Sequence, residues 1–282
     1  MIKSYIINLD RHPERLEIMN KRFADLGIPY QKISAIDGRQ ISDLEFSKFA
    51  DARPGVQACG KWSKGKMGCF LSHFQARKLA AESPCQYTAI FEDDMWLADN
   101  IVDFLRNTEW IPRQADIVRL EAPGPWLVML SKKDKRRHHG RDVQRVLPNT
   151  FKHAWPIGNG GYIISKAGAQ KFMEAPIDKH MHMDQFTYNT SISELANELC
   201  VYQLNPACCI QDKYYHKDAS KIKFESDIEI NASENEALYD TSVGVKRSII
   251  SLAKKIGILQ PFKKLRRLYY YLHGCRKVYF SA

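Results

Sequence analysis

Apolar residues recur along the first third of the chain with two different spacings, and these spacings predict strands and helices in turn. Tyr5–Ile7 is a short apolar run typical of a strand. Pro13 can begin a helix whose apolar residues are spaced three and four apart, and Gly27 ends it. Residues 30–36 alternate weakly between apolar and polar, which indicates a second strand.

The same alternation of elements continues through the middle of the chain. Residues 68–82 have a helical pattern, and residues 87–91 and 116–120 are apolar runs typical of buried strands. Residues 161–164 form another such run, after which Ser165 can cap a helix that reaches Met173. Strands that alternate with helices predict an α/β fold with a mostly parallel central sheet. Ligands of such sheets bind beyond the C-terminal ends of the strands.

Three consecutive acids, Glu92-Asp93-Asp94, follow directly after the predicted strand at residues 87–91. In an extended chain, positions two apart face the same side, so Glu92 and Asp94 would converge while Asp93 points away. Two carboxylates completed by phosphate oxygens are a common site for Mn²⁺ or Mg²⁺. The alternative interpretation is an acidic loop that caps the next helix.

Other catalytic and cofactor motifs are weak or absent in the sequence. Residues 60–67 nearly fit a phosphate loop, but Met67 replaces the hydroxyl residue that would hold Mg²⁺, so we interpret them as a loop leading into a helix. The seven cysteines show no CxxC spacing, which favours reduced thiols. The histidines and cysteines show no zinc-ligand spacing, and His73 lies inside an apolar helix without the glycines of a nucleophile elbow.

The composition indicates a folded protein with a basic C-terminal segment. The chain has 282 residues, of which 44% are hydrophobic and 26% charged, which excludes disordered, collagen-like and disulfide-scaffold classes. No apolar run is long enough to span a membrane, and no signal peptide is evident. The net charge is +10, and ten Lys and Arg residues with no acid lie between Lys246 and the C-terminus. Residues 1–245 are therefore neutral overall.

The basic segment has the pattern of two amphipathic helices separated near Pro261. Apolar residues are spaced four and three apart in residues 245–259, and three and four apart in residues 262–272. We therefore predict a division into residues 1–244, the catalytic body, and residues 245–282, a helical segment that attaches to an anionic membrane surface. The alternative is that both apolar stripes pack onto the body. Nucleic acid is not an expected partner, because no nucleic-acid-binding motif accompanies the charge.

A second basic run, residues 132–139, lies between strand-like segments. Such a run is usually a solvated loop, and we predict one here. A contact with a phosphorylated acceptor is the alternative interpretation.

Several motifs occur together in one order, and as a set they resemble glycosyltransferase family 25, the group that contains lipooligosaccharide galactosyltransferases. The resemblance covers roughly residues 2–222 and rests on the segments Ile7-Asn8-Leu9-Asp10-Arg11 with Arg15, Ala35-Ile36-Asp37-Gly38, Gly68-Cys69-Phe70-Leu71-Ser72-His73, Ile90-Phe91-Glu92-Asp93-Asp94, Gly161-Tyr162-Ile163-Ile164-Ser165, Asp184 and Gln211. The family commonly has an acid before the Gly-Cys helix, where this chain has Lys66-Met67.

The resemblance implies a GT-A-type nucleotide-sugar-binding fold and an inverting, divalent-metal-dependent transfer of galactose from UDP-galactose. Together with the basic segment, it predicts a lipooligosaccharide or other lipid-linked glycan as acceptor. It also predicts a cytoplasmic enzyme at the inner face of the membrane. The alternatives are another UDP-sugar donor, a non-lipid acceptor, or a non-catalytic membrane protein that binds nucleotide sugars. The oligomeric state is left open.

The resemblance also assigns expected roles to individual residues. Glu92 and Asp94 would hold Mn²⁺ or Mg²⁺, with His216 as a third ligand. Asp184 would be the catalytic base, with Asp212 as the reserve. The residues expected to bind the nucleotide sugar are Asn8, Arg15, Asp37, Asp93 and Gln211.

Overall fold

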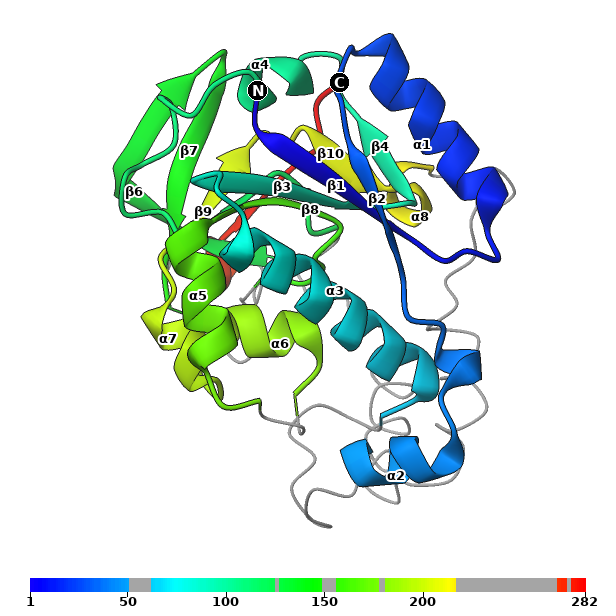
Figure 1. The fold of residues 1–282 in the computed structure, drawn as a ribbon. Coiled ribbons are helices and arrows are strands. Elements are labelled where there is room, and N and C mark those ends of the chain that lie inside the picture. The colour runs from blue at the N-terminus through cyan, green and yellow to red at the C-terminus, as the bar shows by residue number, and fades with distance from the viewer. Residues whose placement is uncertain (51–61, 125–126, 149–155, 178–180, 217–267, 273–274) are drawn as a thin grey trace, which may run out of the picture.

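The computed structural model describes residues 1–50, 62–124, 127–148, 156–177, 181–216, 268–272 and 275–282, and its centre is a nine-stranded sheet (Figure 1). The strand order is β11-β6-β7-β9-β5-β8-β3-β1-β2. The strands are β1 (Lys3–Asn8), β2 (Gln31–Ser34), β3 (Tyr87–Glu92), β5 (Ile117–Arg119), β6 (Leu127–His138), β7 (Arg141–Val146), β8 (Gly161–Ser165), β9 (Val201–Asn205) and β11 (Cys275–Lys277). Two further strands, β4 (Met95–Leu97) and β10 (Cys209–Gln211), pair with each other.

Helices cover both faces of the sheet (Figure 1). The helices are α1 (Pro13–Asp25), η1 (Gly38–Gln40), α2 (Asp43–Ala50), α3 (Lys64–Glu82), α4 (Ile101–Leu105), α5 (Lys166–Glu174), α6 (Met183–Tyr188), α7 (Glu194–Glu198) and α8 (Asp212–Tyr215). The elements expected from the apolar spacing are confirmed as β1, α1, β2, α3, β3, β5, β8 and α5. Ser165 caps α5 by accepting a hydrogen bond from the backbone N–H of Gly168.

Two hydrophobic cores lie on opposite faces of the sheet because strand side chains alternate between faces. In β1, Ile6 packs into the core that includes Phe23 of α1, whereas Tyr5 and Ile7 pack into the core that includes Phe70 of α3. The sheet is therefore the middle layer of three.

The prediction of a mostly parallel sheet is wrong. β1 pairs parallel with β2 and β3, and β5 pairs parallel with β9, but the other five neighbouring pairs are antiparallel. β8 causes part of this mixture, since it lies antiparallel between β3 and β5. Parallel order is kept at the β2-β1-β3 edge, where helical segments connect the strands.

The predicted solvated loop at residues 132–139 is also wrong, because most of it continues β6. Exposed side chains from Lys132 to Arg137 lie on this strand, which turns back into β7. The turn uses His139 and Gly140, both with positive φ, as a two-residue turn of type I′ requires. The basic run therefore forms the outer half of a hairpin (Figure 1).

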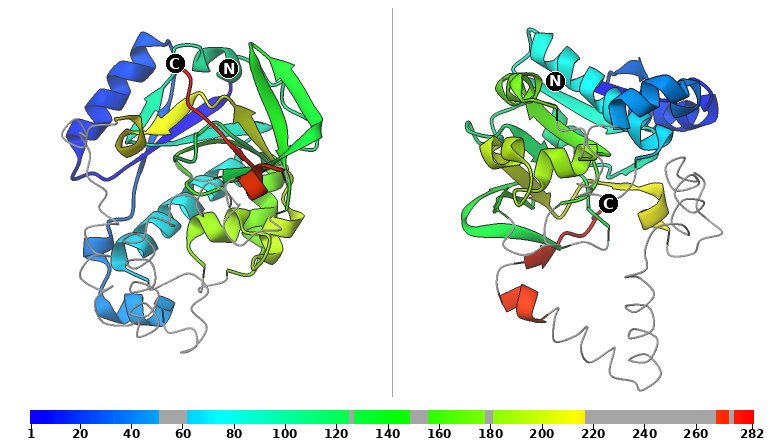
Figure 2. Two further views of the ribbon diagram at one scale, coloured as in Figure 1. Left: turned by 180° about the vertical axis from the view of Figure 1, so that it is seen from behind. Right: turned by 90° about the horizontal axis from the view of Figure 1, so that it is seen from below.

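The C-terminal residues belong to the body of the protein. β11 pairs antiparallel with β6 at the edge of the sheet, and Phe280 forms a bridge with Ala207 (Figure 2). The described part of residues 245–282 is thus not only helical. Residues 245–267, which carry most of the predicted membrane-attachment segment, lie outside the described residues. Among the described helices, none is long and apolar enough to cross a membrane.

Candidate active site

A cavity of about 740 Å³ lies beyond the C-terminal ends of β1 and β3. Its walls come from the N-terminal half of α3, the loop that contains η1, residues 157–159 before β8, and the start of α6. This is where the strand-end rule for α/β sheets places a ligand. The end of β3 contributes three carboxylates to its lining, those of Glu92, Asp93 and Asp94.

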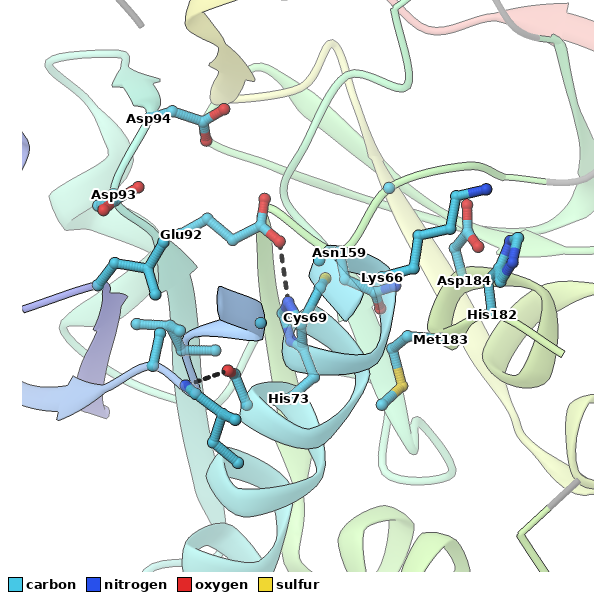
Figure 3. A pocket seen from close by; sticks show the side chains of 18 of the residues that line it. Lys66, Cys69, His73, Glu92, Asp93, Asp94, Asn159, His182, Met183 and Asp184 are labelled. Carbon is cyan, nitrogen blue, oxygen red and sulfur yellow. Dashed lines mark hydrogen bonds and ion pairs between the residues drawn. The ribbon is translucent and has the colours of Figure 1, made fainter. Parts of the chain in front are cut away.

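Helix α3 reaches the cavity because its first turns pack closely on the loop containing η1. Ser63 caps the helix by accepting a hydrogen bond from the backbone N–H of Lys66. Gly68 faces the backbone of Ile36, where an added Cβ would lie 2.5 Å from the carbonyl oxygen. The Ile36 backbone N–H donates to the Ser72 hydroxyl at 2.8 Å. These contacts place the N-terminal half of α3, including Lys66, against the cavity (Figure 3).

Glu92 is held by hydrogen bonds to both carboxylate oxygens. His73 Nε2 lies 2.9 Å from Glu92 Oε1, and Gln211 Nε2 donates to Oε2 at 3.0 Å. Burial opposes the charge of Glu92, but the hydrogen bonds from His73 and Gln211 and the charge on His73 outweigh it. The pKa of Glu92 therefore lies below its usual value. Glu92 lies on the cavity wall with its carboxylate turned toward His73 (Figure 3).

Asp94 differs from Glu92 because one of its carboxylate oxygens has no partner. Asp94 Oδ1 is buried without a hydrogen bond in the described structure. Burial and the negative charges of Glu92, Asp93 and Glu121 raise the pKa of Asp94 well above its usual value. A bound cation would remove this penalty, since it supplies both a partner and an opposite charge.

Asp93 turns to other partners, as the alternation along an extended chain predicts. Its Oδ2 accepts a hydrogen bond from Asn8 Nδ2 at 2.7 Å, and Arg15 Nη1 lies 3.7 Å from its Oδ1. Burial raises the pKa of Asp93 despite these partners. Asn8 and Arg15 thus lie at the acidic motif, and Arg15 also lines the cavity.

Glu121 is a site residue that we did not predict. It follows β5 after one intervening residue, lines the cavity, and accepts a hydrogen bond from the backbone N–H of Gly160 at 2.8 Å. Arg119 Nη2 lies 4.0 Å from the same oxygen. Burial raises the pKa of Glu121 to about 7, although Arg119 acts in the opposite direction. Glu121 could have been predicted from the sequence, because it is an acid just after a buried strand, as Glu92 is.

Asp184, the predicted base, lies in the first turn of α6 and lines the same cavity. Its Oδ1 accepts a hydrogen bond from the backbone N–H of Gln185 at 2.9 Å. Burial raises the pKa of Asp184, while backbone hydrogen bonds from Gln185 and Gly158 oppose the rise. In the view of Figure 3, Asp184 is on the side of Lys66 and away from Asp93 and Asp94.

The other predicted nucleotide ligands also line the cavity. Asp37 caps η1 through the backbone N–H of Arg39 at 2.9 Å, and Arg11 Nε donates to Asp37 Oδ2 at 2.8 Å. Gln211 reaches the cavity through its bond to Glu92. Segments that are far apart in the sequence therefore meet in one cavity.

His216 and Asp212 lie beside the acidic motif, because the Asp212 backbone N–H donates to the Asp94 carbonyl oxygen at 2.8 Å. His216 Nε2 is 3.5 Å from Asp212 Oδ1, and the His216 ring packs edge-on against Trp96 with centroids 5.5 Å apart. Asp212 is fully buried and accepts a hydrogen bond from Trp96 Nε1 at 2.5 Å. Neither residue is part of the cavity lining, whereas their neighbour Lys213 is.

A second group that the sequence analysis missed surrounds His73. The His73 ring bridges Glu92 and the hydroxyl of Tyr162, which lies 3.2 Å from Nδ1. Arg77 Nε donates to the same hydroxyl at 3.1 Å, and Arg77 Nη2 donates to Asn159 at 2.7 Å. These buried hydrogen bonds connect the middle of α3 to the acidic motif and to the loop before β8.

Comparison with known proteins identifies the family of the chain. The model for glycosyltransferase family 25 (LPS biosynthesis protein) matches residues 1–187, which contain the acidic motif and most of the cavity lining. The chain belongs to glycosyltransferase family 25. Within the family 25 region, residues 51–61, 125–126, 149–155 and 178–180 lie outside the described residues.

Two named relatives cover most of the chain. "Lacto-N-neotetraose biosynthesis glycosyltransferase LgtE" of Neisseria meningitidis serogroup B is 29% identical over 78% of this chain and 78% of its own length. "Lipooligosaccharide biosynthesis protein lic2B" of Haemophilus influenzae is 28% identical over 94% of each chain. A solved structure, that of a glycosyltransferase involved in the glycosylation of the major capsid of PBCV-1, covers 74% of this chain with 9% identity and a TM-score of 0.38.

Proposed function

We propose that this family 25 protein transfers galactose from UDP-galactose to a hydroxyl of a lipooligosaccharide or similar lipid-linked glycan, with inversion at the anomeric carbon. The observation that carries the proposal is the acidic motif at the end of β3, which lines a cavity large enough for a nucleotide sugar. The names of the relatives support a lipooligosaccharide acceptor, and the resemblance to the family supports the donor and the GT-A type of fold.

The donor set fits a hard divalent cation. Asp94 Oδ1 is buried without a partner, and Glu92 presents a second carboxylate to the same cavity. Carboxylate oxygens together with phosphate oxygens are the ligands that Mn²⁺ and Mg²⁺ prefer. When bound, the cation would neutralise charge on the departing diphosphate. Glu92 and Asp94 are the proposed protein ligands. His216 as a third ligand stays a prediction: it is not part of the cavity lining, but its Nε2 is buried without a hydrogen bond.

The chain's own residues supply positioning and proton transfer. The acceptor hydroxyl forms a bond to the anomeric carbon as the bond from that carbon to the β-phosphate oxygen breaks, and UDP leaves with the electron pair. Asp184 takes the hydroxyl proton as general base. Arg15 and Lys213, which line the cavity, would hold the negatively charged donor.

The first test is UDP release from a panel of UDP-sugars, with Mn²⁺ and again with a chelator. We expect metal-dependent release from UDP-galactose, faster with a lipid-linked glycan acceptor. Release from UDP-glucose or a UDP-N-acetylhexosamine alone would change the donor assignment. UDP binding without turnover of any donor, with every acceptor tested, would favour a non-catalytic binding protein.

Asp94→Asn is the variant that tests the acidic motif. We expect a loss of roughly 100-fold or more in kcat/KM, because a neutral amide is a poor ligand for a hard cation. Asp99→Asn is the matched control, since Asp99 is an exposed acid just beyond β4. Circular dichroism of both variants checks the fold. Full activity of Asp94→Asn would refute the role of this carboxylate.

A further inference from the structure

Three ligand atoms of different chemistry meet where α3 passes the end of β3. One ligand atom from each of Cys69, His73 and Glu92 lies within 4.8 Å of the other two. Cys69 and His73 are four residues apart on α3 and so share one side of the helix, which faces Glu92 (Figure 3). We propose that Cys69, His73 and Glu92 form a second metal site, which binds a thiophilic divalent ion such as Zn²⁺.

The distances suit zinc coordination with little movement. Zinc prefers four ligands, with bonds of about 2.3 Å to sulfur and about 2.0–2.2 Å to nitrogen and oxygen, so nitrogen and oxygen ligands lie roughly 3.3 Å apart. His73 Nε2 and Glu92 Oε1 are now 2.9 Å apart and share a proton. A zinc ion would take the place of that proton and would separate the two atoms by a few tenths of an ångström.

Neighbouring groups already orient two of the three ligands. Tyr162 lies 3.2 Å from His73 Nδ1 and can accept its proton in a hydrogen bond, which leaves the Nε2 lone pair for the ion. Gln211 holds Glu92 through Oε2, the oxygen that does not face His73. Partners of this kind fix a ligand without occupying its metal-binding atom, and they raise metal affinity.

Charge and access also favour the site. A Cys69 thiolate and the Glu92 carboxylate would together neutralise a divalent ion, while His73 binds as a neutral ring. All three residues line the cavity, so an ion can enter and a fourth position can be filled by water or substrate. Mn²⁺ and Mg²⁺ prefer oxygen ligands, whereas thiolate and imidazole select zinc. The two ions would therefore share Glu92 but differ in their other protein ligands.

Glu92 would belong to both sites, and this has a consequence for catalysis. A zinc ion held by Cys69 and His73 would withdraw Glu92 from the catalytic cation, so zinc should inhibit transfer in the presence of Mn²⁺. This consequence rests on the proposed function. The binding itself rests on the geometry of the three residues and can be tested without any sugar donor.

Binding is tested by titrating the full-length, metal-free, reduced protein with Co²⁺, which reports a thiolate ligand through a sulfur-to-cobalt charge-transfer absorption. We expect this absorption in the wild type, its displacement by Zn²⁺, and its loss in Cys69→Ser. The affinity for Zn²⁺ should fall by roughly 100-fold in Cys69→Ser. Loss of a residue that only hydrogen-bonds a metal ligand already lowers metal affinity by about 10–100-fold, and loss of a ligand itself should cost at least as much. Cys85→Ser is the matched control, because Cys85 is also half-buried but lies outside the cavity lining.

Two results would overturn the site. One is a folded wild type that shows no thiolate-to-cobalt absorption, and the other is a Cys69→Ser variant that binds Zn²⁺ as tightly as the wild type. Glu92→Gln provides a second variant with the same expected loss. If no sugar is transferred at all, the binding result still decides the site. If zinc binds but transfer continues unchanged, the shared use of Glu92 is refuted.

Discussion

At the scale of single residues, the proposed transfer depends most on the carboxylate of Asp184, the proposed base. It lies in the first turn of α6, lines the cavity, and is oriented by the backbone N–H of Gln185. Asp184→Asn keeps an oxygen for that hydrogen bond but cannot take a proton. We expect kcat to fall by roughly 10²–10⁴ while the affinity for UDP stays the same, because the acceptor proton loses its base.

Steady-state kinetics and calorimetric titration with UDP measure the two effects of Asp184→Asn separately. Glu194→Gln is a suitable control, since Glu194 is an exposed acid in the first turn of α7. If Asp184→Asn kept its kcat, the base would have to be another acid. Glu121 would then be the next candidate, because it lines the same cavity.

Glu121 should make the stability of the metal-free protein depend on pH. Burial raises its pKa to about 7 in the folded protein, from an ordinary value of 4.5. Between these values the folded state binds more protons than the unfolded state, so the free energy of unfolding falls as the pH rises. Glu121 alone would account for about 3 kcal/mol at most. Asp93, Asp94 and Asp184 act in the same direction.

Glu121→Gln isolates this contribution. Urea unfolding with chelator at about pH 5 and about pH 8 should show a smaller loss of stability in Glu121→Gln than in the wild type, because the amide does not titrate. Glu109→Gln, at an exposed position, should behave as the wild type. An unchanged pH dependence in Glu121→Gln would mean that other carboxylates carry the effect.

At the scale of elements, local patterns located the site but not all of its members. The apolar run of β3 and the acids after it were enough to predict Glu92 and Asp94 at a strand end. Cys69 and His73 were missed because ligand spacing was sought along the sequence, whereas their common partner, Glu92, comes from another element. The i, i+4 spacing within α3 was the only local signal.

Strand direction was less predictable than strand position. The apolar run of β8 was recognised, but nothing in its sequence states that it lies antiparallel between β3 and β5, since direction depends on long-range pairing. The outer half of β6 has the sequence pattern of a loop, because its side chains are charged and exposed. The side chains from Lys132 to Arg137 are all exposed, so this part of the strand has no buried face to produce an alternating pattern.

The contact between α3 and the loop containing η1 gives a test at this scale. Gly68→Ala would place a Cβ 2.5 Å from the Ile36 carbonyl oxygen and 3.0 Å from the Gly38 nitrogen, both backbone atoms. We expect a loss of about 1–3 kcal/mol in stability, which outweighs the better helix propensity of alanine. Transfer activity should fall as well, because α3 carries His73.

Urea unfolding and donor turnover measure the effects of Gly68→Ala. Gln75→Ala is the control on the same helix, since Gln75 is exposed and its replacement should change stability little. A Gly68→Ala variant that is more stable than the wild type would contradict the close packing of α3 on this loop.

At the scale of the whole molecule, the boundary of the basic segment does not coincide with a boundary of the fold. All the excess positive charge lies after residue 245, yet β11 within that segment forms one edge of the sheet. The buried Arg141 donates from Nη2 to the Ser281 carbonyl oxygen at 2.7 Å. Membrane attachment through residues 245–282 stays a prediction. A vesicle-binding test should therefore replace lysines before residue 268 and keep residues 275–282 in place.

Two neighbouring residues after β11 can show that the C-terminus stabilises the body. Val278 is 1% exposed and packs in a small hydrophobic cluster that includes Val128 and Leu130. Tyr279, in contrast, is 62% exposed. Val278→Ala should lower the free energy of unfolding by roughly 1–3 kcal/mol, because it removes buried methyl groups and leaves a cavity. Tyr279→Ala should change it by less than about 0.5 kcal/mol.

Urea unfolding of the full-length variants separates the two possible roles of the C-terminus. If both substitutions were neutral, the C-terminal residues would be dispensable for the body, and the division at residue 244 would describe the fold as well as the charge. If Val278→Ala alone is destabilising, a truncation after residue 244 would remove part of the core. Any loss of vesicle binding by such a truncation could then reflect unfolding, and only charge substitutions would measure the attraction to an anionic membrane.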